Sequence, residues 1–178
     1  MTLAVILGGA RSGKSALALE LGCRWAGQVT FVATAEPRDE EMRKRVERHR
    51  RERPSEWQLI EEPRELASLS VWQRDDLVIV DCLTLWVSNL LGAKHDEEAI
   101  VAAAERLAAV AVARRPPTVI VTNEVGLGVV PTTPLGRQFR DLLGRVNGVL
   151  VARADTALFV VAGRALRLEP IAVEEMLA

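Results

Sequence analysis

Short apolar runs alternate along the chain with longer segments in which apolar residues recur at helical spacing. The apolar runs lie at residues 3–7, 29–33, 77–81, 118–121 and 157–161. Their length and their content of branched residues are typical of strands buried in a parallel sheet. The segments at 15–25, 39–53, 83–91, 97–114 and 134–154 predict helices. Strands that alternate with helices predict an α/β fold in which helices flank a mainly parallel sheet.

Three weaker segments complete the pattern. Residues 57–60 form a short apolar segment, residues 64–69 predict a short helix, and residues 166–168 predict a short edge strand. No internal repeat or linker interrupts the chain, and 178 residues suffice for one domain but are few for two. We therefore predict a single domain over residues 1–178.

Composition narrows the class of protein. Hydrophobic residues make up 49% and charged residues 26% of the chain, which is typical of a globular core and excludes disorder. The net charge of −1 does not favour nucleic acid or a membrane surface as a partner. The two cysteines indicate neither a disulfide framework nor a metal cluster, and no apolar stretch approaches the roughly 20 residues of a membrane span. We expect a cytoplasmic protein.

The first strand runs directly into a glycine-rich loop and a helix. Residues 8–15 fit the pattern G-x-x-x-x-G-K-S of a phosphate-binding P-loop. Its residues are Gly8, Gly9, Ala10, Arg11, Ser12, Gly13, Lys14 and Ser15. Glycines allow successive backbone N–H groups to converge on phosphate oxygens, and the helix aims its positive end at the same point. Lys14 can reach the β- and γ-phosphates. Because strand, loop and helix follow one another in the required order, a glycine-rich turn with a chance lysine is the less favoured interpretation. We therefore predict a P-loop NTPase-like (RecA-like) domain.

A second phosphate-site element is the apolar strand 77–81, which ends in Asp81. In P-loop enzymes a carboxylate at this place, together with the hydroxyl at the position of Ser15, holds Mg²⁺. In an open parallel sheet, ligands lie beyond the carboxyl ends of the strands. Ala33, Thr34 and Ala35 end another predicted strand, so they are candidates to face the nucleotide.

The predicted helix 39–53 is strongly basic, with seven basic and two acidic residues between positions 43 and 53. Met42, Val46 and His49 are spaced i, i+4 and i+7 and therefore share one face, which we predict to be the inward stripe of an otherwise solvated helix. Arg45 and Arg53 lie one turn on either side of the histidine. The pattern alone favours a solvated charged face and a histidine paired with a carboxylate. Residues 122–131 leave a similar choice between a loop that lines the site and a plain turn.

Several motifs, taken together, resemble one family over residues 3 to about 168. They are the P-loop; Arg48-His49-Arg50 before Arg53-Pro54 and Trp57; Asp81-Cys82-Leu83-Thr84 with Ser88-Asn89-Leu90-Leu91; Thr122-Asn123-Glu124-Val125-Gly126 with Val129-Val130-Pro131; and Phe139-Arg140-Asp141 with Gly144-Arg145-Val146-Asn147. This set is similar to the bifunctional adenosylcobinamide kinase / adenosylcobinamide-phosphate guanylyltransferase of vitamin B12 biosynthesis.

The resemblance implies two reactions. A nucleoside triphosphate, ATP or GTP, phosphorylates adenosylcobinamide, and GMP then passes from GTP through a histidine to adenosylcobinamide phosphate. The family's nucleophile maps onto His49, and attack requires a neutral imidazole, which the nearby arginines favour. The resemblance adds nucleotide-binding roles for Ala33, Thr34, Ala35, Arg50, Arg51, Glu52, Arg53 and Glu61. It also implies Mg²⁺ near Asp81 and a homotrimer.

Three other interpretations of the sequence remain. The first is a different small-molecule P-loop kinase in which His49 is structural. The second is a RecA-like ATPase that binds nucleic acid through the basic helix, although four Trp, three Phe and no Tyr offer few side chains for base stacking. The third is a GTP-binding scaffold without catalysis.

Overall fold

The computed structural model describes residues 2–37 and 39–171, apart from the side chains of Glu41 and Arg45. All of its strands belong to one seven-stranded sheet in the order β3-β2-β4-β5-β1-β6-β7. The strands are β1 (Leu3–Gly8), β2 (Val29–Ala33), β3 (Gln58–Glu61), β4 (Leu77–Asp81), β5 (Thr118–Val121), β6 (Thr156–Val161) and β7 (Arg164–Leu168). Every neighbouring pair is parallel except β6 and β7, which are antiparallel.

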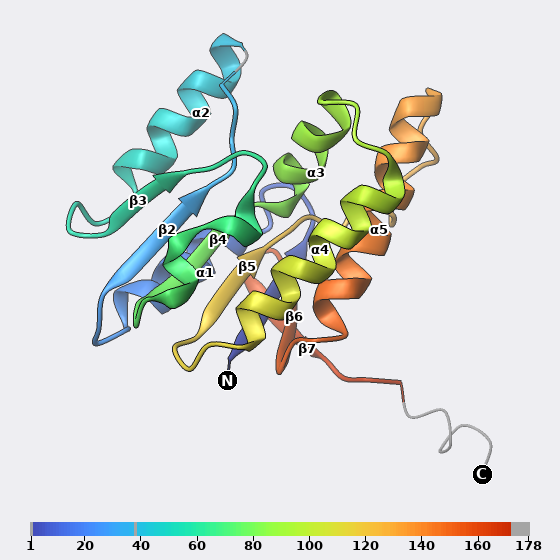
Figure 1. Ribbon diagram of the computed structural model, residues 1–178. Helices are drawn as coiled ribbons and strands as arrows, with labels where there is room; N and C mark the ends of the chain where they lie inside the picture. Colours follow the sequence, from blue (N-terminus) through green and yellow to red (C-terminus); the bar gives the residue numbers. More distant parts are fainter. Residues whose placement is uncertain (1, 38, 172–178) are drawn as a thin grey trace.

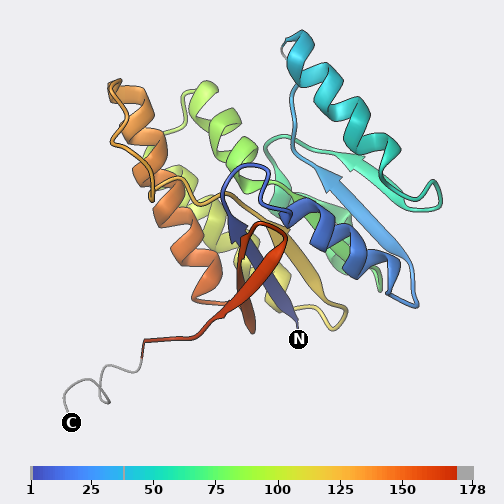
Figure 2. The same cartoon turned by 180° about the vertical axis from the view of Figure 1, so that it is seen from behind.

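Helices cover both faces of the sheet, as Figures 1 and 2 show from opposite sides. They are α1 (Lys14–Cys23), α2 (Glu40–Arg51), α3 (Leu83–Gly92), α4 (Glu97–Val112) and α5 (Pro134–Val151). The layer of α3, α4 and α5 covers the face seen in Figure 1, whereas α1 lies on the face seen in Figure 2. Helix α2 lies beyond β2 and β3, apart from the other helices.

Alternation along the strands divides the core into two apolar clusters. Val80 and Ile120 pack with Leu107 and Leu142 under the α3–α5 layer. Their strand neighbours, such as Val121, pack with Ala18 of α1 on the opposite face. Successive strand residues point to opposite faces, and here both faces are covered. This burial explains why the strands read as continuous apolar runs rather than as alternating ones.

Three helices begin where the sequence offers an N-cap. The side chains of Asp39 and Asp96 accept hydrogen bonds from the backbone N–H groups of Met42 and Ala99, both at 2.7 Å. Thr133 caps α5 in the same way, ahead of a proline in the first turn. Such caps satisfy N–H groups that have no partner inside the helix.

The predicted strands and long helices are present, with shifts of a few residues at their ends. The short helix predicted over residues 64–69 is instead two 3₁₀ segments, Leu66–Ser68 and Ser70–Gln73, which anchor the buried side chains of Leu66, Val71 and Trp72. The edge strand starts at Arg164, two residues earlier than predicted, because Ala162 and Gly163 adopt positive φ and reverse the chain tightly. Among the described helices, none combines the length and the apolarity needed to cross a membrane.

Candidate active site

The P-loop connects β1 to α1 and depends on two glycines with positive φ. Gly8 has φ of 151° and Gly13 has φ of 106°. A Cβ on Gly8 would lie 2.3 Å from the carbonyl oxygen of Val160, which is far inside contact distance. The β6–β7 hairpin supports the loop from outside, because the N–H of Gly163 donates to the carbonyl of Ser12 at 2.8 Å. The loop is therefore held in its curled form by the neighbouring strand and hairpin.

We expect the substitution Gly8→Ala to lower the free energy of unfolding by at least about 2 kcal/mol, because it combines a backbone clash with an unfavourable φ. Gly148→Ala is the matched control, since a Cβ there meets no atom within 4 Å and the residue lies in α5. The control should raise stability by up to about 1 kcal/mol, because alanine favours the helix. Urea denaturation of both variants measures the difference. Equal stability of Gly8→Ala and the wild type would contradict the account of the loop.

Lys14 and Ser15 begin α1 at the inner side of the loop. The Lys14 side chain is only 6% exposed. Its ammonium group donates hydrogen bonds to the Gly9 carbonyl and to the Ser12 hydroxyl, the latter at 3.3 Å. The charge therefore lies over the loop whose N–H groups are predicted to hold the phosphates, as the sequence pattern requires.

Asp81 ends β4, and the chain after it is tied to the end of β2. The hydroxyl of Thr34 donates to the Cys82 carbonyl at 2.7 Å and accepts from the Cys82 N–H at 2.8 Å. Thr34 is completely buried, so its side chain serves this contact and does not face the pocket. Its neighbours Ala33 and Ala35 do line the pocket. Of the three residues predicted at this strand end, the two alanines thus line the pocket and Thr34 does not.

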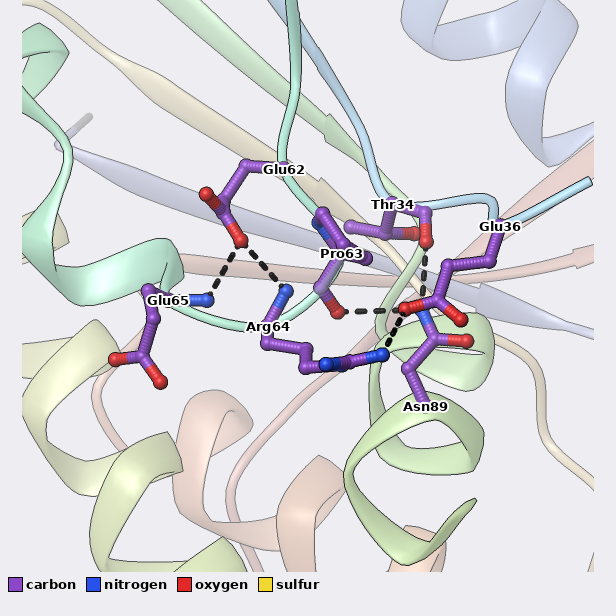
Figure 3. Close-up of polar contacts among 7 residues, drawn as sticks. All are labelled: Thr34, Glu36, Glu62, Pro63, Arg64, Glu65 and Asn89. Atoms are coloured by element: carbon purple, nitrogen blue, oxygen red, sulfur yellow. Dashed lines mark hydrogen bonds and ion pairs between the residues drawn. The ribbon is translucent and has the colours of Figure 1, made fainter. Parts of the chain in front are cut away.

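One buried side chain of α3 joins two connections at this edge of the sheet (Figure 3). The Asn89 amide donates to the Thr34 carbonyl at 2.7 Å and to the Pro63 carbonyl at 3.2 Å. Beside it, Arg64 forms an ion pair with Glu36 at 2.6 Å. These contacts fix Thr34 and Glu36, which follow β2. In the sequence Asn89 stood out only as part of the Ser88-Asn89-Leu90-Leu91 motif, which did not indicate these two partners.

A single pocket brings together residues from the P-loop helix, the ends of β2 and β4, and the inner face of α2. Its lining comprises Ser15, Phe31, Ala33, Ala35, Met42, Val46, His49, Arg53, Asp81, Cys82 and Leu85. The helical spacing that predicted an inward face for Met42, Val46 and His49 is confirmed. His49 therefore shares one pocket with Ser15 and Asp81, although these residues are far apart in the sequence.

His49 lies on the pocket wall with its side chain 29% exposed. Its Nδ1 lies 3.6 Å from a carboxylate oxygen of Glu52, one turn further along the chain. That carboxylate lies at the Nδ1 edge of the ring, which leaves Nε2 on the other edge. Glu52, predicted as a nucleotide-binding residue, therefore lies beside the ring and outside the pocket lining. This is the neighbouring carboxylate that the sequence pattern alone favoured for His49. The side chain of Arg45, the other predicted neighbour, lies outside the described part of the structure.

Arg53 supplies the positive charge inside the pocket. Its guanidinium lies over the ring of Phe31, 4.4 Å from the ring centroid. Burial and then the nearby Arg50 lower the pKa of Arg53, while Asp81 and Glu61 act in the opposite direction. An arginine with a lowered pKa still stays protonated at neutral pH. Arg53 therefore presents a fixed, partly desolvated charge close to Asp81.

The remaining predicted residues lie outside this lining. Arg50 pairs with Glu61, with 3.5 Å between the charged groups, and both side chains are largely exposed. Arg51 is exposed on α2 as well. These side chains form the outer rim around α2 and β3, and the structure does not bring them to the P-loop.

Ser15 and Asp81 are the residues that fit Mg²⁺. Their hydroxyl and carboxylate are hard oxygen ligands that face one pocket beside the P-loop. The described residues contain no group of three or more His, Cys, Asp or Glu that would enclose a metal ion by themselves. That agrees with a P-loop site, in which phosphates and water complete the shell around one or two protein ligands.

A curled phosphate loop on a parallel sheet, with an acidic residue at the end of a nearby strand, defines a P-loop nucleotide-binding enzyme. A family model described as cobinamide kinase / cobinamide phosphate guanyltransferase matches residues 4–168. The chain belongs to this family, and the resemblance found in the sequence is confirmed.

Curated relatives agree with the family match. The bifunctional adenosylcobalamin biosynthesis protein CobU of Salmonella typhimurium is 40% identical, covering 93% of this chain and 98% of the relative. CobU of Escherichia coli is 38% identical with the same coverage. The bifunctional adenosylcobalamin biosynthesis protein CobP of Pseudomonas aeruginosa is 39% identical, covering 89% of this chain and 92% of the relative. The chain is thus an enzyme of a bifunctional kinase and guanylyltransferase family in cobalamin biosynthesis.

Solved structures add information on the fold alone. An ATPase from the type III secretion system of pathogenic bacteria superposes with a TM-score of 0.56 at 11% identity. The match covers 93% of this chain and 56% of that chain. The predicted RecA-like P-loop fold is confirmed.

Proposed function

We propose that this chain phosphorylates adenosylcobinamide with ATP or GTP and then transfers GMP from GTP, through His49, to the adenosylcobinamide phosphate. The product is adenosyl-GDP-cobinamide. The observation that carries the proposal is the placement of His49 in one pocket with Ser15 and Asp81. A nucleophile on that wall faces the place where a triphosphate held by the P-loop would lie.

In the kinase step the P-loop N–H groups and Lys14 hold the phosphates of the donor. The hydroxyl oxygen of the aminopropanol arm attacks the γ-phosphorus, the bond to the β–γ bridging oxygen breaks, and the nucleoside diphosphate leaves with the electron pair. Bound at Ser15 and Asp81, Mg²⁺ would neutralise phosphate charge. Lys14 contributes most where negative charge shifts toward the leaving diphosphate.

In the guanylyl step the neutral ring of His49 attacks the α-phosphorus of GTP with Nε2. Pyrophosphate leaves, and Arg53 offsets the negative charge around it. A phosphate oxygen of the corrinoid then attacks the phosphorus of GMP–His49, the P–N bond breaks, and the imidazole is regenerated. Glu52 at the Nδ1 edge stabilises the positive charge that the ring carries while it is bonded to phosphorus.

The same geometry weakens the interpretation of α2 as a nucleic-acid-binding face. Arg53 points into the pocket over Phe31, and Arg50 is paired with Glu61. Two of the basic side chains are therefore already engaged, which leaves a weaker patch for a phosphate backbone. A homotrimer and a cytoplasmic location also remain part of the proposal, and sedimentation of the purified chain would test the first.

Two assays on the wild-type chain test the proposal. In the first, ATP and adenosylcobinamide should give adenosylcobinamide phosphate. In the second, GTP labelled at its α-phosphate should leave label on the protein that is lost in acid and survives in base, as expected for a phosphohistidine-type bond. Kinase activity without protein label would contradict the guanylyl half and would favour a simple P-loop kinase.

A further inference from the structure

The sheet order places the end of β5 between the two halves of the phosphate site. Strand β5 lies between β4, which ends in Asp81, and β1, which leads into the P-loop. In register, Val121 at the end of β5 pairs with Asp81 on one side and with Ile6 on the other. On the proposed function, a γ-phosphate lies between Lys14 and the metal ligand Asp81. The residues that follow β5 therefore emerge between the strand that ends in Asp81 and the strand that leads into the P-loop.

Asn123 is held from three directions at this place. Its N–H donates to the Thr84 hydroxyl at 2.8 Å, just beyond Asp81, and its carbonyl accepts from the Asn147 amide of α5 at 3.0 Å. The next residue is tied to the P-loop, because the N–H of Glu124 donates to the Gly8 carbonyl at 3.0 Å. The backbone at Asn123 is thus fixed relative to both the Asp81 connection and the phosphate loop.

The direction of the Asn123 side chain follows from its neighbour. The Thr122 hydroxyl bonds to Asn147 on α5 at 2.8 Å, so the Thr122 side chain points to the α5 face of the sheet. Strand-like hydrogen bonding to β1 continues through Thr122 and Glu124. Since successive residues alternate, Asn123 points to the opposite face, which carries α1 with Lys14 and Ser15.

The side-chain amide of Asn123 is also available to a ligand. Among the described residues it forms no hydrogen bond through its side chain, and it is half-buried. Asn89 and Asn147, by contrast, use their amides to satisfy carbonyls or hydroxyls of the protein. A rigidly mounted amide with free N–H donors beside a phosphate site is suited to bind phosphate oxygen.

We infer that Asn123 is a catalytic residue of the kinase step, in which its side-chain N–H donates a hydrogen bond to an oxygen of the γ-phosphoryl group in the transition state. The amide neither gains nor loses a proton. The acceptor oxygen gains the bond to phosphorus, the diphosphate leaves with the electron pair of the broken bond, and the hydroxyl proton passes to water. In the guanylyl step the bond that breaks lies between the α- and β-phosphates, so contact with the γ-phosphate changes little there.

The test compares both reactions in Asn123→Ala, Asn123→Asp and the wild type. We expect Asn123→Ala to lower the kcat of the kinase step by about 100-fold with little change in the KM for ATP, as for the loss of one transition-state donor. Asn123→Asp keeps the size of the side chain but places a carboxylate against phosphate, and its loss should be at least as large. Labelling of the protein by GTP should stay within about threefold of wild type. Gln138→Ala, which removes an exposed amide on α5, is the matched control.

Failure of the proposed function and failure of the role of Asn123 give different results. A wild type and a Gln138→Ala control that phosphorylate adenosylcobinamide and accept label establish the proposed function on which this inference rests, and a wild type that does neither refutes that function. With an active wild type, kinase activity of Asn123→Ala within threefold of normal would overturn the role of Asn123. Equal loss of both reactions, or full activity of the isosteric Asn123→Asp, would also overturn it, because a purely structural role produces those results.

Discussion

His49→Ala is expected to abolish the transfer of GMP while leaving most of the kinase activity. The imidazole nitrogen is the nucleophile that forms the covalent bond to GMP. Its loss should therefore lower the rate of guanylyl transfer by more than about 1,000-fold. The kinase step uses the P-loop and the residues around Asp81 and makes no bond to His49. His49 lies within α2, and alanine has a high helix propensity, so the fold should be unaffected. Parallel assays of both reactions give the result.

The chain offers a matched control for this experiment in its only other histidine. His95 is exposed in the turn between α3 and α4 and lies outside the pocket lining. His95→Ala should therefore behave as wild type in both assays. Equal loss of the two activities in His49→Ala, with an unchanged melting temperature, would mean that His49 supports the whole site and is not the nucleophile.

Lys14→Ala is expected to impair both reactions, since both depend on a triphosphate held in the same loop. Lys14 is almost fully buried and its ammonium group bonds to the P-loop, where a charge acts strongly on phosphate. We expect a loss of about 100-fold or more in kcat/KM for the kinase and for guanylylation. The comparison of Lys14→Ala with His49→Ala thus separates a residue common to the two steps from a residue used by one.

Lys44→Ala serves as the control for charge removal. Its side chain is 74% exposed on α2 and lies 4.0 Å from Glu40, a surface ion pair of little energetic consequence. Both reactions should proceed at wild-type rates in this variant. If Lys14→Ala lost only one of the two reactions, the triphosphate would have to bind elsewhere for the other, and the single-site account would be wrong.

The sequence predicted those parts of the site that depend only on the spacing of residues within one loop, strand or helix. The P-loop is a contiguous pattern, Asp81 follows directly from an apolar strand, and the inward face of His49 follows from its spacing to Met42 and Val46. In each case the residues that define the feature lie within about two helical turns or one strand, so the geometry of a regular element is enough.

The rest depends on contacts between distant segments. Asn89 reaches the Thr34 carbonyl across 55 positions and the Pro63 carbonyl across 26 positions. No periodicity within a helix indicates such partners. The placement of β5 between β1 and β4 is likewise a property of the sheet order, because an alternation of strands and helices fits several orders. Consequently the role inferred for Asn123 depends on the sheet order and could not be predicted from the sequence.

Peptide mass spectrometry of the wild-type chain after exposure to GTP shows directly whether His49 is the nucleophile. We expect one added GMP on the peptide that contains His49, absent from His49→Ala and removed when adenosylcobinamide phosphate is supplied. A protein that turns over both substrates without ever carrying GMP, or that carries it on another residue, would rule out transfer through His49.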